Sequence, residues 1–188
     1  KWYTRRDNFN ENGLTVGIAF YSSNINEGQS KPLDLIIRKL EENGFNVLGG
    51  FGWDPDVVSE LFLDKSGKSR VDFVLAFSMK FSSALNDKMN NSLKKLDVPV
   101  INAISSYYNT LTDWKSDPQG LSTMEVAWAV ANPEISGIIE PTVLAGKEEF
   151  LDVNSSRKVF ANEPVTENMD AFISRLKMWK KLKKTDNS

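Results

Sequence analysis

Residues 120–146 read Gly120-Leu-Ser-Thr-Met-Glu-Val-Ala-Trp-Ala-Val-Ala-Asn-Pro-Glu-Ile-Ser-Gly-Ile-Ile-Glu-Pro-Thr-Val-Leu-Ala-Gly146. Ser122 and Glu125 have the spacing of a capping box, which predicts that a helix begins there. Pro133 predicts the end of that helix, because proline lacks the N–H group that a helix interior uses. The apolar run at 135–144 predicts a strand, with a break near Pro141. The stretch therefore forms one helix–strand unit of an α/β domain.

The preceding residues repeat this alternation. Apolar runs of strand length lie at 14–20, 45–51, 71–77 and 98–104. Apolar residues at helical spacing predict helices at 30–44, from Asp54-Pro55 onward, and from Ser82 or Ser83 to Leu96. Residues 105–121 are polar and predict a long loop. Short, regular connections predict an α/β fold, an open and mostly parallel sheet with helices on both faces, either flavodoxin-like or Rossmann-like.

We divide the chain into three parts. Residues 1–13 are an N-terminal extension, 14–146 the α/β domain, and 147–188 a polar connection followed by a C-terminal basic amphipathic helix. That helix is expected over 166–183, with Met169, Phe172 and Leu176 on one side and lysines near its end. A solvated helix end, where the helix dipole favours cations, explains the lysines. The alternative is a docking helix for a larger protein.

The composition limits the kinds of catalysis and ligand binding that this chain can support. The 188 residues carry a net charge of −2 and include no cysteine and no histidine. Thiolate chemistry is therefore excluded, and the commonest metal ligand and neutral-pH base is missing. The charge gives no reason to expect nucleic acid, and no apolar run is long enough to span a membrane. Gly49-Gly-Phe-Gly52 and Ser66-Gly-Lys-Ser69 depart from phosphate-binding fingerprints, so we expect no nucleotide site in this chain.

The loops that follow the expected strands are rich in hydroxyl and aromatic side chains. They are Tyr21-Ser-Ser-Asn24, Gly50-Phe-Gly-Trp53, Ser78-Met-Lys80 and Ser105-Ser-Tyr-Tyr108. Ligands of open parallel sheets bind at the carboxyl ends of strands. Such a lining suits a flat, partly apolar ligand better than a free phosphate. The alternative is that these are ordinary loops, which favour Ser, Gly and Asn in any protein.

Three carboxylates lie in the opening stretch. Glu125 is the reciprocal half of the capping box, a structural role. Glu134 follows the expected helix end, and Glu140 is expected near the carboxyl end of its strand, where parallel sheets place working residues. Each is either a surface carboxylate or a hard oxygen ligand for a divalent cation or a proton acceptor.

The same stretch resembles the large, porphyrin- or corrin-binding subunit of cobaltochelatase and magnesium chelatase. The resemblance rests on Pro133-Glu-Ile-Ser-Gly137, Ile138-Ile-Glu-Pro141 and Val143-Leu-Ala-Gly146. The strand Val16–Tyr21, the helix Pro32–Gly44 and Val98-Pro-Val-Ile-Asn102 resemble earlier parts of the family pattern. Ser22-Ser23 replace the Arg or His that often follows the tyrosine there. The chain is much shorter than the subunit, so we expect a fragment.

The resemblance implies that this domain binds a tetrapyrrole and takes part in inserting a divalent metal, with ATP hydrolysed by separate AAA+ partner subunits. Glu134 and Glu140 would handle the metal or remove pyrrole protons, and Trp53, Tyr107 and Tyr108 would contact the macrocycle. The metal is cobalt, magnesium or iron, and the expected location is cytoplasmic. Two alternatives stay open: a non-catalytic scaffold that docks partners, including the rest of the large subunit, and a chelatase-like protein that removes metal from haem.

Overall fold

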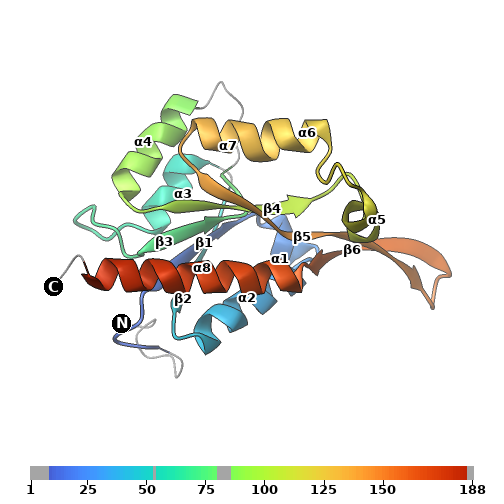
Figure 1. The fold of residues 1–188 in the computed structure, drawn as a ribbon, viewed down its shortest axis with the longest axis horizontal. Helices are drawn as coiled ribbons and strands as arrows, with labels where there is room; N and C mark the ends of the chain where they lie inside the picture. Colours follow the sequence, from blue (N-terminus) through green and yellow to red (C-terminus); the bar gives the residue numbers. More distant parts are fainter. Residues whose placement is uncertain (1–8, 53, 80–85, 186–188) are drawn as a thin grey trace.

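The computed structural model describes residues 9–52, 54–79 and 86–185 and contains one six-stranded sheet (Figure 1). The strand order is β2-β1-β3-β4-β5-β6. β1 to β5 are parallel, and β6 is antiparallel to β5. The order of the first five strands is that of flavodoxin-like sheets and differs from the Rossmann order. The strands are β1 Thr15–Phe20, β2 Asn46–Phe51, β3 Phe73–Ala76, β4 Val100–Ser106, β5 Ile139–Asp152 and β6 Arg157–Pro164. The predicted fold class is confirmed.

Helices cover both faces of the sheet. In Figure 1, α3, α4 and the segment from α6 to α7 lie on one face, and α2 and α8 lie on the other. Each face has a separate apolar core, because strands of a parallel sheet bury residues on both sides. The helices are α1 Ser23–Asn26, α2 Lys31–Glu42, α3 Pro55–Leu61, α4 Asn86–Leu96, α5 Leu111–Ser116, α6 Thr123–Glu125, α7 Asn132–Ile135 and α8 Thr166–Thr185.

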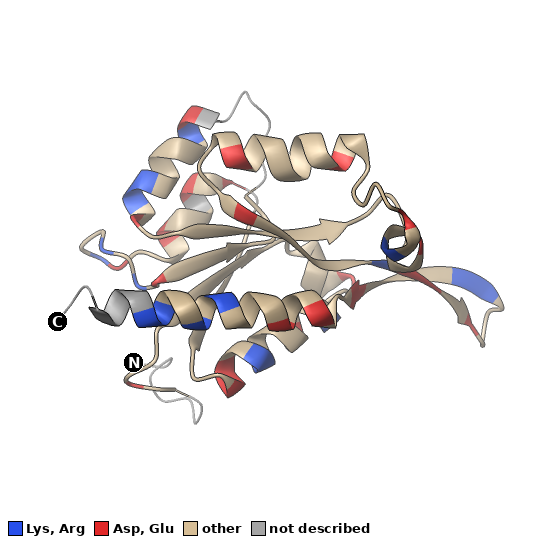
Figure 2. Cartoon of the chain, in the orientation of Figure 1, with Lys and Arg blue, Asp and Glu red and all other residues tan. Residues whose placement is uncertain are grey.

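The C-terminal helix α8 belongs to the core of the domain. Met169, Phe172 and Leu176 are buried against the sheet, so the apolar side predicted from sequence is confirmed. Figure 2 shows Asp and Glu near the start of α8 and Lys and Arg toward its end, the polarity that the helix dipole favours. The apolar side of α8 is thus part of the core, and docking of a larger protein through its exposed basic side stays a prediction. Within the described residues, no helix is long and apolar enough to cross a bilayer.

The helix predicted to stop at Pro133 continues past it. A π-helical turn, Val126–Ala131, follows α6 and runs without a break into α7, which contains Pro133. Pro133 has no N–H to donate to the carbonyl of Ala129, four residues earlier, and this carbonyl accepts a hydrogen bond from Asn102 Nδ2 instead. The end comes at Gly137, with φ of 87°, and the N–H of Ile138 donates to the carbonyl of Pro133. The strand therefore begins only at Ile139, four residues later than expected.

Two further stretches differ from the sequence prediction. The expected long loop at 105–121 contains α5. The expected polar connection over 147–164 is a β-hairpin, because β5 runs on to Asp152 and β6 returns along it. Asn154 and Ser155 lie in its turn, where the Asp152 carboxylate accepts hydrogen bonds from both backbone N–H groups. The last helix was predicted from Thr166 and is found there.

Candidate functional site

A hollow of about 270 Å³ opens at the edge of the sheet where β1 and β4 end. We call it the carboxyl-edge hollow. Its lining combines aromatic rings, amides and one lysine from four parts of the chain, and it includes Tyr107, one of the predicted contact residues. The lining residues are Ser23, Asn24, Glu27, Gln29, Tyr107, Lys147, Phe160, Ala161 and Asn162. The position agrees with the rule that ligands of open parallel sheets bind at the carboxyl ends of strands.

Tyr107 is held in place by the buried carboxylate of Glu125. One oxygen of Glu125 accepts hydrogen bonds from Ser106 Oγ at 2.7 Å and from the backbone N–H of Tyr107 at 3.1 Å. The other oxygen accepts from the N–H and Oγ of Ser122, completing the predicted capping box. Burial raises the pKa of Glu125, but the hydrogen bonds from Ser106, Ser122 and Tyr107 outweigh it and hold the pKa below its usual value. Glu125 thus joins α6 to the exit of β4.

Tyr21 stands beside Tyr107 at the exit of β1. Burial raises the pKa of Tyr21 to about 12, and the neighbouring Tyr107 hydroxyl adds to the shift. The Tyr21 hydroxyl is therefore protonated at neutral pH and can donate a hydrogen bond but cannot serve as a phenolate base. The backbone N–H of Tyr21 donates to Asn24 Oδ1 at 3.1 Å, which orders the short turn into α1.

The β5–β6 hairpin supplies the charged and aromatic wall of the carboxyl-edge hollow. Lys147 Nζ lies 5.2 Å from the centre of the Phe160 ring, within range of a cation–π interaction. Asn162 is fixed from two sides, since its Oδ1 accepts from Ser105 Oγ and its backbone N–H donates to Gln29 Oε1. The wall is therefore tied to β4 and to the loop before α2.

The sequence prediction missed Lys147, Phe160 and Asn162, because the hairpin was taken for a polar connection. A signal for it was present. Aromatic and β-branched residues flank the polar run Asn154–Lys158 on both sides, which is typical of two strands joined by a turn. Of the other predicted contacts, Tyr108 is about half exposed and does not line the hollow, and Trp53 lies outside the described residues.

Glu134 and Glu140 lie at the opposite edge of the sheet. Glu134 is an exposed residue of α7, and Glu140 is the second residue of β5 rather than near its carboxyl end. The expected position of Glu140 was wrong, because the preceding helix runs on to Ile135 and delays the strand. β4 spans the sheet in seven residues, so this amino edge and Tyr107 are roughly 20 Å apart at about 3.3 Å per residue. The structure does not bring these glutamates together with Tyr107 and Tyr108.

Glu140 has two unusual features. Its backbone has φ of 54°, in the left-handed region that non-glycine residues rarely adopt, directly before Pro141. Its Oε2 is buried and accepts no hydrogen bond from any residue that the structure describes, although Arg175 Nη1 of α8 lies 3.9 Å away. Across the described ranges, no three Asp or Glu residues are arranged to hold a metal ion.

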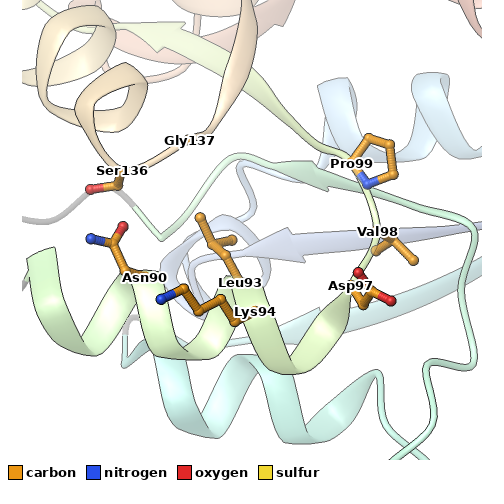
Figure 3. A pocket seen from close by; sticks show the side chains of 8 residues that line it. All are labelled: Asn90, Leu93, Lys94, Asp97, Val98, Pro99, Ser136 and Gly137. Atoms are coloured by element: carbon orange, nitrogen blue, oxygen red, sulfur yellow. The ribbon is translucent and has the colours of Figure 1, made fainter.

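A second, more open hollow of about 480 Å³ lies at this amino edge (Figure 3). It is bounded by the second half of α4, the loop 97–99 that leads into β4, and Ser136 and Gly137 between α7 and β5. Asn90, Lys94, Asp97 and Ser136 provide its polar side chains, and it has no aromatic lining residue. Neither Glu134 nor Glu140 lines it. The carboxyl-edge hollow therefore offers the better lining for a flat ligand.

Comparison with known proteins bears on what this domain is. A family described as CobN/Magnesium Chelatase matches residues 1–188, the whole chain. The uncharacterized protein MJ1441 of Methanocaldococcus jannaschii is 32% identical over 187 residues, which cover 90% of this chain and 14% of that protein. A magnesium-chelatase subunit of Rhodobacter capsulatus is 34% identical over 142 residues, covering 72% of this chain and 12% of that protein.

The fold is also found in a solved structure. The catalytic subunit of cobaltochelatase from Mycobacterium tuberculosis superposes with a TM-score of 0.64 and 20% identity, over 86% of this chain and 14% of that one. At this identity the match concerns the fold. The chain thus spans between 12% and 14% of the length of these three proteins.

Proposed function

The chain belongs to the CobN/magnesium chelatase family, and from this premise we propose that it is a domain of a chelatase large subunit which holds part of a tetrapyrrole during insertion of a divalent metal. The observation that supports the tetrapyrrole is the carboxyl-edge hollow, with Tyr107 and Phe160 as aromatic surfaces and Lys147 beside the Phe160 ring. The two named relatives that are chelatases act with cobalt or magnesium, as their names state.

The lining matches the chemistry of such a substrate. A tetrapyrrole is a flat conjugated ring system, which stacks on aromatic side chains, and it carries carboxylates at its periphery. The Lys147 ammonium can pair with one of these carboxylates, while amides of Asn162 and Gln29 offer further hydrogen bonds. A hollow of about 270 Å³ is below the usual range for a drug-sized ligand, so it would take one side of the macrocycle. Other segments of the subunit would hold the remainder.

The partners follow from the same proposal. ATP would be hydrolysed on separate AAA+ subunits. Ser66-Gly-Lys-Ser69 is the run in this chain most like a phosphate-binding loop, but it forms a turn before a strand, whereas a phosphate loop precedes a helix. The metal, cobalt, magnesium or iron, is the cargo of the reaction. Insertion in the cytoplasm is the favoured function, and removal of metal from haem is the alternative. Assay of purified subunits with ATP, metal and macrocycle distinguishes insertion from removal.

Binding by the full-length subunit tests the proposal. Titration with a porphyrin or a corrin, followed by the change in its Soret-region absorption, should give saturable binding. Lys147→Gln should weaken binding by about 10- to 100-fold, because a hydrogen bond to a charged group contributes roughly 1.5–3 kcal/mol. Lys158→Gln is the matched control, since Lys158 is on the same hairpin and pairs with Glu149 at 2.7 Å.

Two outcomes count against it. A full-length subunit that binds neither macrocycle would refute the tetrapyrrole function. Equal affinities of Lys147→Gln and Lys158→Gln would place the macrocycle elsewhere in the subunit and leave the family assignment intact.

Metal insertion could instead take place at the amino edge of the sheet. The sequence predicts that Glu134 and Glu140, which lie there, bind the metal or accept pyrrole protons. The observation that favours it is the strained backbone of Glu140 together with its buried Oε2, because such strain is concentrated at functional sites. At roughly 20 Å from Tyr107, given about 3.3 Å per strand residue, Glu140 does not reach a macrocycle in the carboxyl-edge hollow of the same domain. Chelation rates of glutamate variants decide between the placements.

A further inference from the structure

Three amide side chains line the carboxyl-edge hollow, and in each of them the carbonyl oxygen has a partner within the protein. The backbone N–H of Tyr21 donates to Asn24 Oδ1 at 3.1 Å, and the backbone N–H of Asn162 donates to Gln29 Oε1. Asn162 Oδ1 accepts from Ser105 Oγ at 3.2 Å. Because a backbone N–H can only donate, the oxygen ends of Asn24 and Gln29 must face the protein.

The amino groups of these amides are the ends left for a ligand. The side-chain nitrogens of Asn24, Gln29 and Asn162 donate to no residue that the structure describes. Within the same described ranges, the Lys147 ammonium has no carboxylate partner and lies beside the Phe160 ring. Asn24 is only 9% exposed, so its amino group gains more from a ligand acceptor than an exposed group would. The hollow therefore presents four donor groups.

Side chains that can only accept are scarce in this hollow. Among the described lining residues, Glu27 is the one carboxylate, and it is exposed to water. The hydroxyls of Ser23 and Tyr107 can donate or accept. Such a lining matches a group that has several lone pairs, a negative charge and no N–H of its own, which describes a free carboxylate. A carboxamide of the same shape brings an amino group that meets donors, and it loses the charge that attracts Lys147.

We propose that Asn24, Gln29 and Asn162 make the hollow selective for a macrocycle edge that carries a free carboxylate over the same edge with that group amidated. This inference rests on the proposed function and adds to it which chemical form of the substrate is accepted. Lys147 attracts any anion, whereas the amides supply the rejection, because a donor that meets another donor stays unpaired.

Paired titrations of the full-length subunit test this selectivity. The probes are deuteroporphyrin and its propionamide derivative, and the corrin cobyrinic acid and its amide, each pair in one detergent-containing buffer. The absorption change gives the ratio of the Kd of the amide to that of the acid. In the native subunit the acid of at least one pair should bind about tenfold or more tightly than its amide.

Gln29→Glu is the decisive variant. One carboxylate oxygen still accepts the backbone N–H of Asn162, and the other replaces the amino group with an acceptor. The ratio should therefore fall by about tenfold or more. Gln119→Glu is the matched control, since it makes the same change of charge at an exposed position that does not line the hollow. It should keep the native ratio within about twofold.

The possible failures are distinguishable. Equal binding of acid and amide by the native subunit would overturn the selectivity and leave tetrapyrrole binding in place. Equal ratios for Gln29→Glu and Gln119→Glu would also overturn it and assign the preference to Lys147 alone. If Gln29→Glu does not fold, Asn162→Asp, whose carboxylate still accepts from Ser105 Oγ, takes the same measurement. Binding of none of the four probes would refute the tetrapyrrole function and this inference with it.

Discussion

Glu125 and Ser106 are joined by a hydrogen bond of 2.7 Å that connects the capping box of α6 to the last residue of β4. The same carboxylate accepts the N–H of Tyr107, which lines the carboxyl-edge hollow. The side chain of Glu125 is only 1% exposed, so its charge is stabilised by these donors rather than by water. A residue with a capping role thereby also sets the geometry of the candidate site.

Glu125→Gln should destabilise the 188-residue chain by about 2–3 kcal/mol. The amide group that replaces one oxygen faces donors, so at least one buried donor loses its partner. Urea unfolding measures the change. Glu60→Gln, at an exposed position of α3, is the control and should stay within about 0.5 kcal/mol of the native protein. Equal midpoints for the two variants would contradict the role of Glu125.

The stabilising role of the Glu125 carboxylate should also appear in how the free energy of unfolding depends on pH. The folded-state pKa of Glu125 is lowered, so its contribution is fully present above the unfolded value of about 4.3 and is lost as pH falls through the folded value. The free energy of unfolding of the native chain should therefore fall more steeply in acid than that of Glu125→Gln. Urea titrations from neutral pH downward give both curves, and parallel curves would refute the assignment.

The sequence supports the alternation of strands and helices but not the position of the predicted catalytic groups. Apolar periodicity and the Ser122–Glu125 spacing are local signals, and both were confirmed. Pro133 was misread because a helix can continue through a proline where the lost hydrogen bond is replaced, here by the bond from Asn102 Nδ2 to the carbonyl of Ala129 next to the π-helical turn. Because the helix continues to Ile135, the strand begins at Ile139 instead of residue 135. Glu140 therefore lies at the amino end of its strand and not near the carboxyl end, as expected. The roles of Glu134, Glu140, Tyr107 and Tyr108 stay predictions.

Asn102 explains how that π-helical turn is stabilised. Its Nδ2 donates to the carbonyl of Ala129 at 2.7 Å, in an environment with no solvent exposure. Asn102→Asp should cost about 2–4 kcal/mol at neutral pH, because a carboxylate oxygen would face the carbonyl without a proton between them. Burial would raise the pKa of the new carboxyl, so the loss should shrink in mild acid, where the protonated form donates. A loss that is the same at both pH values would contradict this account.

Gly146→Ala should loosen the base of the β5–β6 hairpin. A Cβ at position 146 would lie 2.6 Å from Leu111 Cδ2, and Leu111 is buried at the start of α5. Overpacking of this kind costs about 1–3 kcal/mol. Gly49→Ala is the control, because its Cβ would meet only the Phe20 ring at 3.4 Å, an ordinary contact. Urea unfolding of both variants provides the comparison, and an equal effect would place the strain elsewhere.

Glu140 allows backbone strain and carboxylate chemistry to be separated. Glu140→Gly should stabilise the chain by up to about 1 kcal/mol, because glycine adopts φ of 54° without a steric penalty. The ion pair with Arg175, at 3.9 Å, is too long and too exposed to offset this gain. Glu140→Gln keeps the backbone strain and removes only the charge.

The metal-insertion rate of the full-length subunit with its partners then tests the predicted role of the carboxylate. If Glu140 accepts pyrrole protons, both variants should slow insertion by about 100-fold or more, although their stabilities differ. Arg175→Gln, which removes the neighbouring cation and keeps the carboxylate, should change the rate much less. Unchanged insertion in Glu140→Gln would refute the role and leave the carboxyl-edge hollow as the favoured location of the chemistry.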